Sequence, residues 1–305
     1  MIIITAPVHP IFLETLDNKG LPFTYVSQCN YDELCYLIPA AEGLVVSTNI
    51  KIDKAIIELG KNLKWIARLG SGMEHIDVAY AHSKNINCVS SPEGNSNAVA
   101  EHAIGLLIGL MRNIPKSIEE VKEYKWLREE NRGAEISGKT IGIIGYGNTG
   151  SRFARLLSSF DARVLVYDKY KSGFSNADVT ETDLSSLCSE ADIISFHVPL
   201  NGETIHMANM DFFGRLQRKP IIINTSRGAV LDTAALIKAL QHKNISGAAL
   251  DVLENEKLES FSANEQEHFK LLINQPNVIL TPHIAGYTYQ SAYLLSKILL
   301  EKLGI

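Results

Sequence analysis

The chain has 305 residues, 46% of them hydrophobic, and its 34 acidic and 29 basic residues give a formal net charge of −5. This length predicts about two domains, and this charge, with no basic block, argues against nucleic acid or a membrane surface as the main partner. The four cysteines form no C-x-x-C pair, so we expect reduced thiols in a cytoplasmic protein, with neither a metal site nor disulfides. The longest apolar stretch, residues 103–111, is too short to cross a bilayer.

Short apolar runs alternate with longer amphipathic segments along the whole chain. Several of the short runs lack polar alternation, which is typical of parallel strands that helices cover on both faces. The predicted strands, in chain order, are Ile2–Thr5, Leu44–Ser47, Trp65–Leu69, Asn87–Val89, Thr140–Ile144, Arg163–Tyr167, Ile193–His197, Ile221–Asn224, Gly247–Leu250 and Val278–Thr281. A long helix is predicted over Asn97–Tyr124, kinked or divided at Pro115, and a last helix over Tyr289–Lys302. The path of residues 257–270 stays open.

The most specific pattern is a glycine motif of the form G-x-G-x-x-G at the end of a predicted strand, formed by Gly145, Gly147 and Gly150. In a dinucleotide site the first glycine permits a tight turn, and the second lets the backbone approach a pyrophosphate. The third lets the following helix pack closely on the sheet. The free N–H groups and the positive dipole of that helix then face the phosphates.

An acidic residue, Asp168, directly follows the predicted strand that comes after the glycine motif. This carboxylate is placed to accept hydrogen bonds from the adenosine ribose hydroxyls, and its charge would repel a 2′-phosphate. The predicted cofactor is therefore NAD rather than NADP, although the nearby Lys169 and Lys171 are a mild signal for the phosphate.

Three later strands are each followed by charged or titratable residues. Arg227 follows one strand, the acids Asp251, Glu254 and Glu256 follow the next, and His283 follows the last. Residues just past the carboxyl ends of such strands line the ligand crevice of a doubly wound sheet. Taken singly, the arginine could instead tie down a loop, the acids could form a solvated surface, and the histidine could be structural.

Together, a series of ordered motifs over nearly the whole chain resembles the D-isomer-specific 2-hydroxyacid dehydrogenases. These motifs are Ala67–Gly72, Ala98–Ala103, the glycine motif, His197–Leu200 with Thr204, Asn224–Gly228, Ala248–Val252 and Pro282–Gly286. The nearest likeness is to the catalytic part of phosphoglycerate dehydrogenases, and we expect no regulatory domain after residue 305.

The resemblance implies a catalytic trio of Arg227, Glu256 and His283, with Glu254 as the competing candidate for the acid. An imidazole, which ordinarily titrates near pH ~6.5, suits both loss and gain of the substrate hydroxyl proton. Glu256 would bind its second nitrogen, and Arg227 would clamp the substrate carboxylate and polarise the 2-oxo oxygen.

The resemblance also assigns residues to the cofactor. These are Gly145, Gly147, Asn148, Thr149, Gly150, Asp168, Val198, Pro199, Thr204, Thr225, Asp251 and Gly286. Among them, Asp251 resembles the acid that holds the nicotinamide carboxamide, and Thr225 would lie beside the nicotinamide.

For the substrate, Ser71 and Gly72 would present N–H groups to a carboxylate, as a small anion nest does. The positive charge at Arg68 is a further resemblance to phosphoglycerate dehydrogenases, in which a cation at this place would help to bind the phosphate. Ser47 stands where some of those enzymes carry a second arginine, which weakens this assignment.

The predicted fold class is α/β, with two doubly wound domains and a cleft between them. The glycine motif lies near mid-chain, and the simplest layout returns the last helix to the first unit. A Rossmann-type NAD-binding domain is therefore predicted over residues 97–286. A smaller, flavodoxin-like substrate-binding domain is predicted over residues 1–96 and 287–305.

The resemblance implies an NAD-dependent oxidoreductase that interconverts a D-2-hydroxy acid and its 2-oxo acid. The preferred substrate is 3-phosphoglycerate, as in serine biosynthesis, with glycerate/hydroxypyruvate and D-lactate/pyruvate as alternatives. A non-enzymatic NAD-sensing scaffold of the corepressor type shares this fold, and formate oxidation would require glutamine in place of Glu256. The helix at 97–124 resembles the arm through which family members dimerise, so a homodimer is expected.

Overall fold

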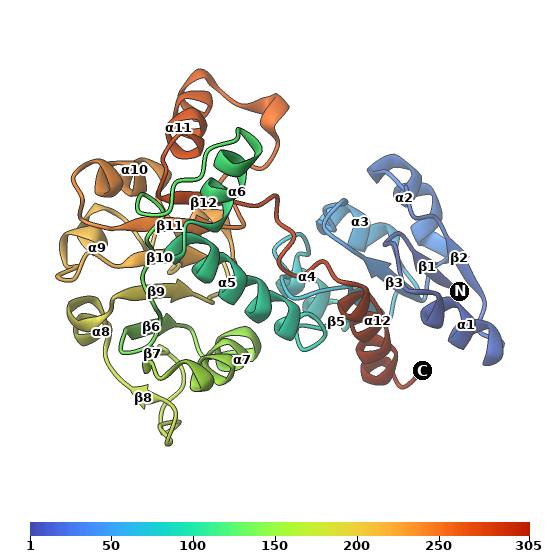
Figure 1. The fold of residues 1–305 in the computed structure, drawn as a ribbon. Coiled ribbons are helices and arrows are strands. Elements are labelled where there is room, and N and C mark those ends of the chain that lie inside the picture. The colour runs from blue at the N-terminus through green and yellow to red at the C-terminus, as the bar shows by residue number, and fades with distance from the viewer. The chain divides into compact units, whose positions relative to one another are not determined.

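The computed structural model describes all of residues 1–305 and divides them into two compact units. The first unit comprises residues 1–96 and 287–305, and the second comprises residues 97–286. Each unit is a parallel sheet with helices on both faces, so the predicted α/β fold class is confirmed (Figure 1). Within the chain no helix has the length and hydrophobicity needed to pass through a membrane.

The first unit has a five-stranded sheet in the order β2-β1-β3-β4-β5, which is the strand order of flavodoxin-like folds. Its strands are β1 (Ile2–Ile4), β2 (Phe23–Tyr25), β3 (Gly43–Val46), β4 (Trp65–Arg68) and β5 (Asn87–Ser90). Its helices are α1 (Pro10–Asn18), α2 (Tyr31–Leu37), the 3₁₀ turn η1 (Ile38–Ala40), α3 (Lys54–Leu59), α4 (Val78–Ser83) and α12 (Tyr289–Leu303).

Successive residues of these strands enter two separate cores, because side chains alternate between the faces of a sheet. Leu44 and Val46 of β3 pack with α2, α3 and α4 on one face. Val45 packs on the other face, where α1 and the last helix α12 meet through Leu16 and Leu299.

The second unit has a seven-stranded sheet in the order β12-β11-β10-β9-β6-β7-β8, the Rossmann order with one added edge strand. Its strands are β6 (Thr140–Ile144), β7 (Arg163–Tyr167), β8 (Thr180–Glu181), β9 (Ile193–Phe196), β10 (Ile221–Asn224), β11 (Gly247–Leu250) and β12 (Val278–Leu280). Its α-helices are α5 (Ser96–Met111), α6 (Ile114–Lys122), α7 (Asn148–Leu157), α8 (Leu184–Glu190), α9 (Met210–Gly214), α10 (Thr233–Gln241) and α11 (Ala263–Ile273). Its 3₁₀ turns are η2 (Ser158–Phe160), η3 (Gly228–Val230) and η4 (Leu258–Ser260).

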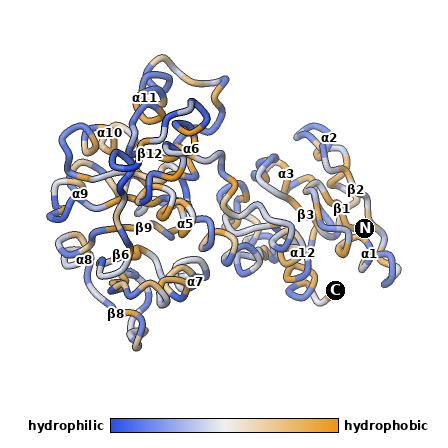
Figure 2. Tube along the Cα trace, in the orientation of Figure 1, coloured by the Kyte–Doolittle hydropathy of each residue, from blue (hydrophilic) through white to orange (hydrophobic).

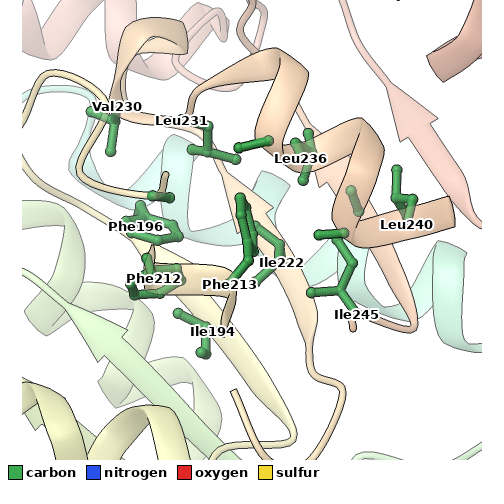
Figure 3. Packing of buried hydrophobic residues seen from close by; sticks show 14 of the residues in the cluster. Ile194, Phe196, Phe212, Phe213, Ile222, Val230, Leu231, Leu236, Leu240 and Ile245 are labelled. Carbon is green, nitrogen blue, oxygen red and sulfur yellow. The ribbon is translucent and has the colours of Figure 1, made fainter. Parts of the chain in front are cut away.

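Figure 1 shows α8, α9 and α10 on one side of this sheet and α5 and α7 on the other. On the first side, Phe213 of α9 packs with Phe196 and Ile222 of the sheet and with Leu236 of α10 (Figure 3). On the second side, Leu107 of α5 and Phe153 of α7 cover the other face of the same strands. Figure 2 shows β9 as hydrophobic and much of the outer path of the chain as hydrophilic. The strands that lead to the site are therefore covered by hydrophobic side chains on both faces.

The structure adds two strands that the sequence patterns did not predict, β2 and β8, both at sheet edges. It also divides the predicted helix over residues 97–124 into α5 and α6. Asn113 adopts a left-handed conformation with φ of 52°, and Pro115 lies in the first turn of α6, where a missing N–H costs nothing. The segment left open at 257–270 forms η4 and most of α11.

Candidate active site

The carboxyl ends of six parallel strands in the second unit are aligned in one row. The register pairs Tyr167 with Ile144, Ile144 with Phe196, Phe196 with Asn224, Asn224 with Leu250, and Leu250 with Leu280. The residue that follows each member of this row therefore emerges at the same edge of the sheet. The row brings together the beginnings of all the segments that carry the predicted catalytic and cofactor residues of this unit.

The glycine motif lies in this row where β6 and β9 are neighbours and the strand order reverses. Gly145 has a φ of 98°, and a Cβ there would lie 2.5 Å from the carbonyl oxygen of His197. A Cβ at Gly150 would lie 2.0 Å from the carbonyl oxygen of Gly145, whereas a Cβ at Gly147 would meet no heavy atom within 4 Å. The backbone at Gly147 is therefore open, and α7 begins directly after it at Asn148. An open glycine before an uncapped helix N-terminus fits a dinucleotide pyrophosphate.

Asp168 follows β7 and is held by backbone N–H groups from two segments. Its Oδ2 accepts from the N–H of Tyr146, inside the glycine motif, at 2.7 Å. Its Oδ1 accepts from the N–H groups of Tyr170 at 2.9 Å and of Lys171 at 3.1 Å. The carboxylate is thus fixed beside the glycine loop, where a ribose would have to lie.

The two lysines near Asp168 are both engaged by the protein. Lys169 Nζ lies 2.6 Å from Glu203 Oε1, and this partner raises the pKa of Lys169 above its ordinary value. Lys171 Nζ donates to the carbonyl oxygen of Tyr146 at 2.7 Å. Glu203 belongs to the turn after β9 and was not singled out from the sequence.

Arg227 lies in a turn that the buried side chain of Asn224 organises. Asn224 Oδ1 accepts from the N–H of Ser226 at 3.0 Å, and its Nδ2 donates to the carbonyl oxygen of Arg227 at 2.9 Å. The guanidinium Nη1 donates to the carbonyl oxygen of Ser226 at 2.7 Å. Thr225, between them, is 7% exposed, and its Oγ1 has no hydrogen-bond partner in the protein.

His283 and Glu256 come together at this edge of the sheet. His283 Nδ1 lies 3.0 Å from Glu256 Oε1 and 2.8 Å from Oε2, and the two side chains are 48% and 42% exposed. A ring nitrogen bound by a carboxylate carries the proton there, which leaves Nε2 for other chemistry. This is the arrangement of a proton-transferring histidine and the acid that orients it.

The competing acid, Glu254, is bound elsewhere. Its Oε2 lies 2.6 Å from His206 Nε2, and its Oε1 accepts from the N–H of Thr233 in the first turn of α10, at 2.8 Å. Glu254 therefore stabilises the start of a helix, and only Glu256 of the two acids contacts His283.

Asp251 lies beneath the loop that carries His283. It is 1% exposed, and its Oδ1 accepts from Thr281 Oγ1 at 2.6 Å. Its two oxygens also accept from the N–H groups of Ile284 and Ala285. Burial by itself would raise the pKa of Asp251, but hydrogen bonds from His102, Thr281 and these two N–H groups lower it below its ordinary value. The carboxylate is thus ionised and anchors the loop, while its predicted role toward a carboxamide stays a prediction.

The remaining predicted residues are spread over both units. Val198 and Pro199 follow β9, and Thr204 closes the same turn by donating to the carbonyl oxygen of Pro199 at 2.6 Å. In the first unit, Arg68 ends β4 and its Nη1 donates to the carbonyl oxygen of Leu69 at 2.7 Å. The substrate-binding roles expected of Arg68, Ser71 and Gly72 in the first unit, and the cofactor-binding role expected of Gly286, remain predictions.

Two histidines at the site have contacts that the sequence did not predict. His197, beneath the glycine loop, has Nε2 2.8 Å from Ser195 Oγ, and its buried Nδ1 has no partner. His102 of α5 has Nε2 3.0 Å from Thr281 Oγ1. Each lies in a motif noted above, but spacing along the chain does not reveal such contacts.

The chain is similar to known proteins in sequence and in fold. Residues 104–285 match the family model described as D-isomer specific 2-hydroxyacid dehydrogenase, NAD binding domain. Among curated proteins, the chain is 36% identical over 272 residues to a hydroxypyruvate reductase of Thermotoga maritima, covering 89% of this chain and 87% of that protein. It is 32% identical over 302 residues to a D-3-phosphoglycerate dehydrogenase of Archaeoglobus fulgidus, covering 98% of this chain but 56% of that protein.

A solved structure of similar fold is the D-lactate dehydrogenase of Aquifex aeolicus complexed with NAD and lactic acid. Its TM-score is 0.86 at 29% identity, and the match covers 99% of this chain and 94% of that one. The chain therefore belongs to the D-isomer-specific 2-hydroxyacid dehydrogenase family, and its second unit is the NAD-binding domain of that family. The expected family and its cofactor NAD are confirmed. The chain spans about half the length of the phosphoglycerate dehydrogenase that it matches.

Proposed function

We propose that this chain is an NAD-dependent oxidoreductase that interconverts a D-2-hydroxy acid and its 2-oxo acid. The observation that carries the proposal is the contact between His283 Nδ1 and Glu256, at 2.8 Å, on the same strand-end row as the glycine motif. A histidine oriented by a carboxylate, beside a dinucleotide loop, suits the removal of a hydroxyl proton while a hydride leaves the same carbon.

In the proposed mechanism the protein residues bind, orient and move a proton. When bound, NAD would supply the nicotinamide ring as the acceptor for the hydride on C2 of the hydroxy acid. His283 Nε2 takes the proton of the C2 hydroxyl, so the C2–O bond becomes a carbonyl, and Glu256 stabilises the resulting imidazolium. Arg227 holds the substrate carboxylate with two parallel N–H donors and stabilises the developing charge on the oxygen at C2.

The contacts of Asp168 support NAD over NADP as the coenzyme. Its carboxylate is fixed beside the glycine loop by three backbone N–H groups, where it would repel a 2′-phosphate. Lys169, which would otherwise attract that phosphate, is paired with Glu203, and Lys171 is turned to a carbonyl of the glycine loop. These contacts weaken the indication of NADP that the two lysines give in the sequence.

For the substrate itself, we propose 3-phosphoglycerate, oxidised to 3-phosphohydroxypyruvate as in serine biosynthesis, on the grounds of Arg68. Ser47, where a second arginine would strengthen this choice, has its hydroxyl 2.7 Å from Asn49 Oδ1. The relatives named for hydroxypyruvate and for lactic acid support glycerate or D-lactate as alternatives. Ser71 and Gly72 would serve any of these, because all carry a carboxylate.

A screen of NADH oxidation tests both the proposed reaction and the proposed substrate. The substrates are phosphohydroxypyruvate, hydroxypyruvate, glyoxylate, pyruvate and 2-oxoglutarate, and we expect turnover with at least one. Arg68→Ala should lower kcat/KM for the phosphorylated substrate by about 10-fold or more relative to the plain acids, as loss of a charged contact does. An equal loss for all would refute the phosphate role, and NADH binding without any turnover would favour an NAD-sensing scaffold.

We further propose a homodimer, supported by the surface of α6. Ile114, Ile118 and Val121 form one face of this helix, and all three are exposed, as is Trp126 just beyond it. An apolar stripe of this kind on a charged helix is typical of an association surface. Ile118→Asp should convert a dimer to a monomer in light scattering, whereas a wild-type monomer at micromolar concentration would refute this proposal.

A cytoplasmic location is proposed on the state of the thiols. All four cysteines are free, and burial raises the pKa of Cys88 and Cys188 to about 11. Such thiols are poor nucleophiles and behave as packing residues, as expected in a reducing compartment.

A further inference from the structure

His102 lies at the far end of a hydrogen-bond chain that reaches the loop of His283. We propose that His102 is a positioning residue for His283, acting through Thr281 and Asp251. This inference rests on the proposed function, in which His283 moves the substrate proton. It gives a role to a residue of the Ala98–Ala103 motif that the proposed mechanism leaves unused.

The hydroxyl of Thr281 has one proton, which determines the directions of the hydrogen bonds around it. Thr281 Oγ1 lies 2.6 Å from Asp251 Oδ1 and 3.0 Å from His102 Nε2. Asp251 is buried and ionised, so it only accepts, and the single hydroxyl proton of Thr281 must point to it. Thr281 therefore accepts from His102, whose Nε2 must carry a proton. That nitrogen is also 3.5 Å from Asp251 Oδ1, so the same N–H stabilises the carboxylate directly.

Asp251 in turn binds the backbone of the loop that carries His283. Asp251 Oδ1 accepts from the N–H of Ile284 at 2.9 Å, and Oδ2 accepts from the N–H of Ala285 at 2.8 Å. The carbonyl oxygen of Asp251 accepts from the N–H of His283 itself, at 2.8 Å. Three consecutive N–H groups are therefore bound to one residue, which fixes the loop on both sides of the imidazole.

The backbone of His283 needs this support. Its φ is 55°, in the left-handed region that residues other than glycine avoid because their Cβ crowds the backbone. Such a conformation persists only where surrounding contacts impose it. If the hydrogen bonds to Asp251 weaken, the loop relaxes toward ordinary φ values and the ring leaves Glu256.

His102 is suited to act as the fixed end of this series of hydrogen bonds. It belongs to α5, whose Ala103, Leu106 and Leu107 are buried against the sheet. Its own side chain is 22% exposed, and the imidazole reaches from this packed helix to Thr281 at the start of the loop. The 179 positions between His102 and Thr281 make this a tertiary contact between the first helix of the unit and the loop after its last strand.

Two pairs of variants test the proposal. His102→Leu removes the donor, and His102→Gln retains an N–H near the place of Nε2. Thr281→Val removes the hydroxyl at nearly equal volume, and Thr281→Ser retains it. The first readout is amide hydrogen exchange of Ile284 and Ala285 in the protein without substrate, with Ile194 in β9 as the control for global unfolding.

Loss of the donor should raise exchange at Ile284 and Ala285 by about 10-fold, as expected for one hydrogen bond to a charged group, with Ile194 unchanged. The second readout is kcat for NADH oxidation, which should fall by about 10-fold in His102→Leu and Thr281→Val while the Kd for NADH changes by less than about 2-fold. His102→Gln and Thr281→Ser should restore most of the protection from exchange and most of kcat.

Unchanged exchange in His102→Leu, or a glutamine variant as impaired as the leucine variant, would overturn the proposal. If the wild type reduces no 2-oxo acid but the exchange pattern is as expected, then His102 does order the loop of His283 and the proposed function is wrong.

Discussion

Glu256 Oε2 lies 2.8 Å from His283 Nδ1, although 27 positions along the chain separate the two residues. They meet because β11 and β12 are neighbouring parallel strands, with Leu250 paired to Leu280, so the segments after both strands leave the sheet at the same edge. The contact fixes which ring nitrogen faces the acid, and with it the nitrogen that the proposed mechanism uses for proton transfer.

Glu256→Gln should lower kcat for NADH oxidation by about 10²-fold or more, because a neutral amide orients the imidazole poorly and does not stabilise its charged form. Glu254→Gln is the matched control, since it removes the same charge two residues away from a contact with His206 and the start of α10. Steady-state kinetics should show near-normal kcat in the control, with at most a small drop in Tm. Equal losses in the two variants would mean that Glu256 has no special role.

Arg227→Ala should lower kcat/KM by about 10²-fold or more, and Arg227→Lys should recover only part of that loss. Lysine keeps the positive charge but lacks the planar fork that binds a carboxylate with two parallel hydrogen bonds. Kinetics with a series of 2-oxo acids, beside a thermal melt, would separate this effect from misfolding. Full activity in the lysine variant would show that charge alone is required.

Gly147→Ala should weaken coenzyme binding without affecting folding, whereas Gly150→Ala should destabilise the fold. A Cβ at Gly147 meets nothing in the protein, so we expect an unchanged Tm with NADH binding weakened by about 10-fold or more, because the methyl group would occupy the path of the pyrophosphate. A Cβ at Gly150 would lie 2.0 Å from the carbonyl oxygen of Gly145, so that variant should lose stability even without coenzyme. Calorimetric titration with NADH and a thermal melt would decide; normal NADH binding by Gly147→Ala would contradict the placement of the pyrophosphate.

His197 should make folding stability depend on pH below neutrality. Burial lowers the pKa of His197 from 6.5 to about 3, so between these values the unfolded chain binds a proton that the folded chain does not. The free energy of unfolding should therefore fall as the pH drops from 7 toward 3, by up to about 1.4 kcal/mol per pH unit from this group. Urea unfolding at pH 7.5 and 5.5 should show a smaller loss for His197→Gln than for the wild type. Equal losses would mean that the ring is protonated in the folded state.

The fold was largely predictable because its strands are short, continuous apolar runs buried on both faces. Ten of them were predicted with ends within one or two residues of those observed. The two that were not, β2 and β8, are edge strands of three residues and two residues. Neither is a continuous apolar run, since β2 is Phe-Thr-Tyr and β8 is Thr-Glu, whereas the edge strand β12, also of three residues, is the apolar run Val-Ile-Leu. Pro115 signalled a break in the long helix, but the left-handed turn at Asn113 that makes the break was not visible in the pattern.

The candidate site was predictable to the extent that residues just past strand ends gather at one edge of a parallel sheet. That rule predicted Arg227, the acids after β11 and His283 at one edge, and the resemblance to the family then selected Arg227, Glu256 and His283 as the trio. It says nothing of contacts between a helix and a distant loop, so the role of His102 required the folded structure. It also left Glu254 and Glu256 in competition, because two residues of spacing in a loop do not determine which acid reaches the histidine.

The central claim is that His283 transfers the proton during hydride transfer with bound NADH. The most direct measurement is single-turnover oxidation of pre-bound NADH by the best 2-oxo acid, comparing the wild type with His283→Ala and measuring the Kd for NADH in both. We predict a rate lower by about 10²-fold or more in the variant, with the Kd nearly unchanged. A variant that oxidises NADH at close to the wild-type rate would contradict the claim.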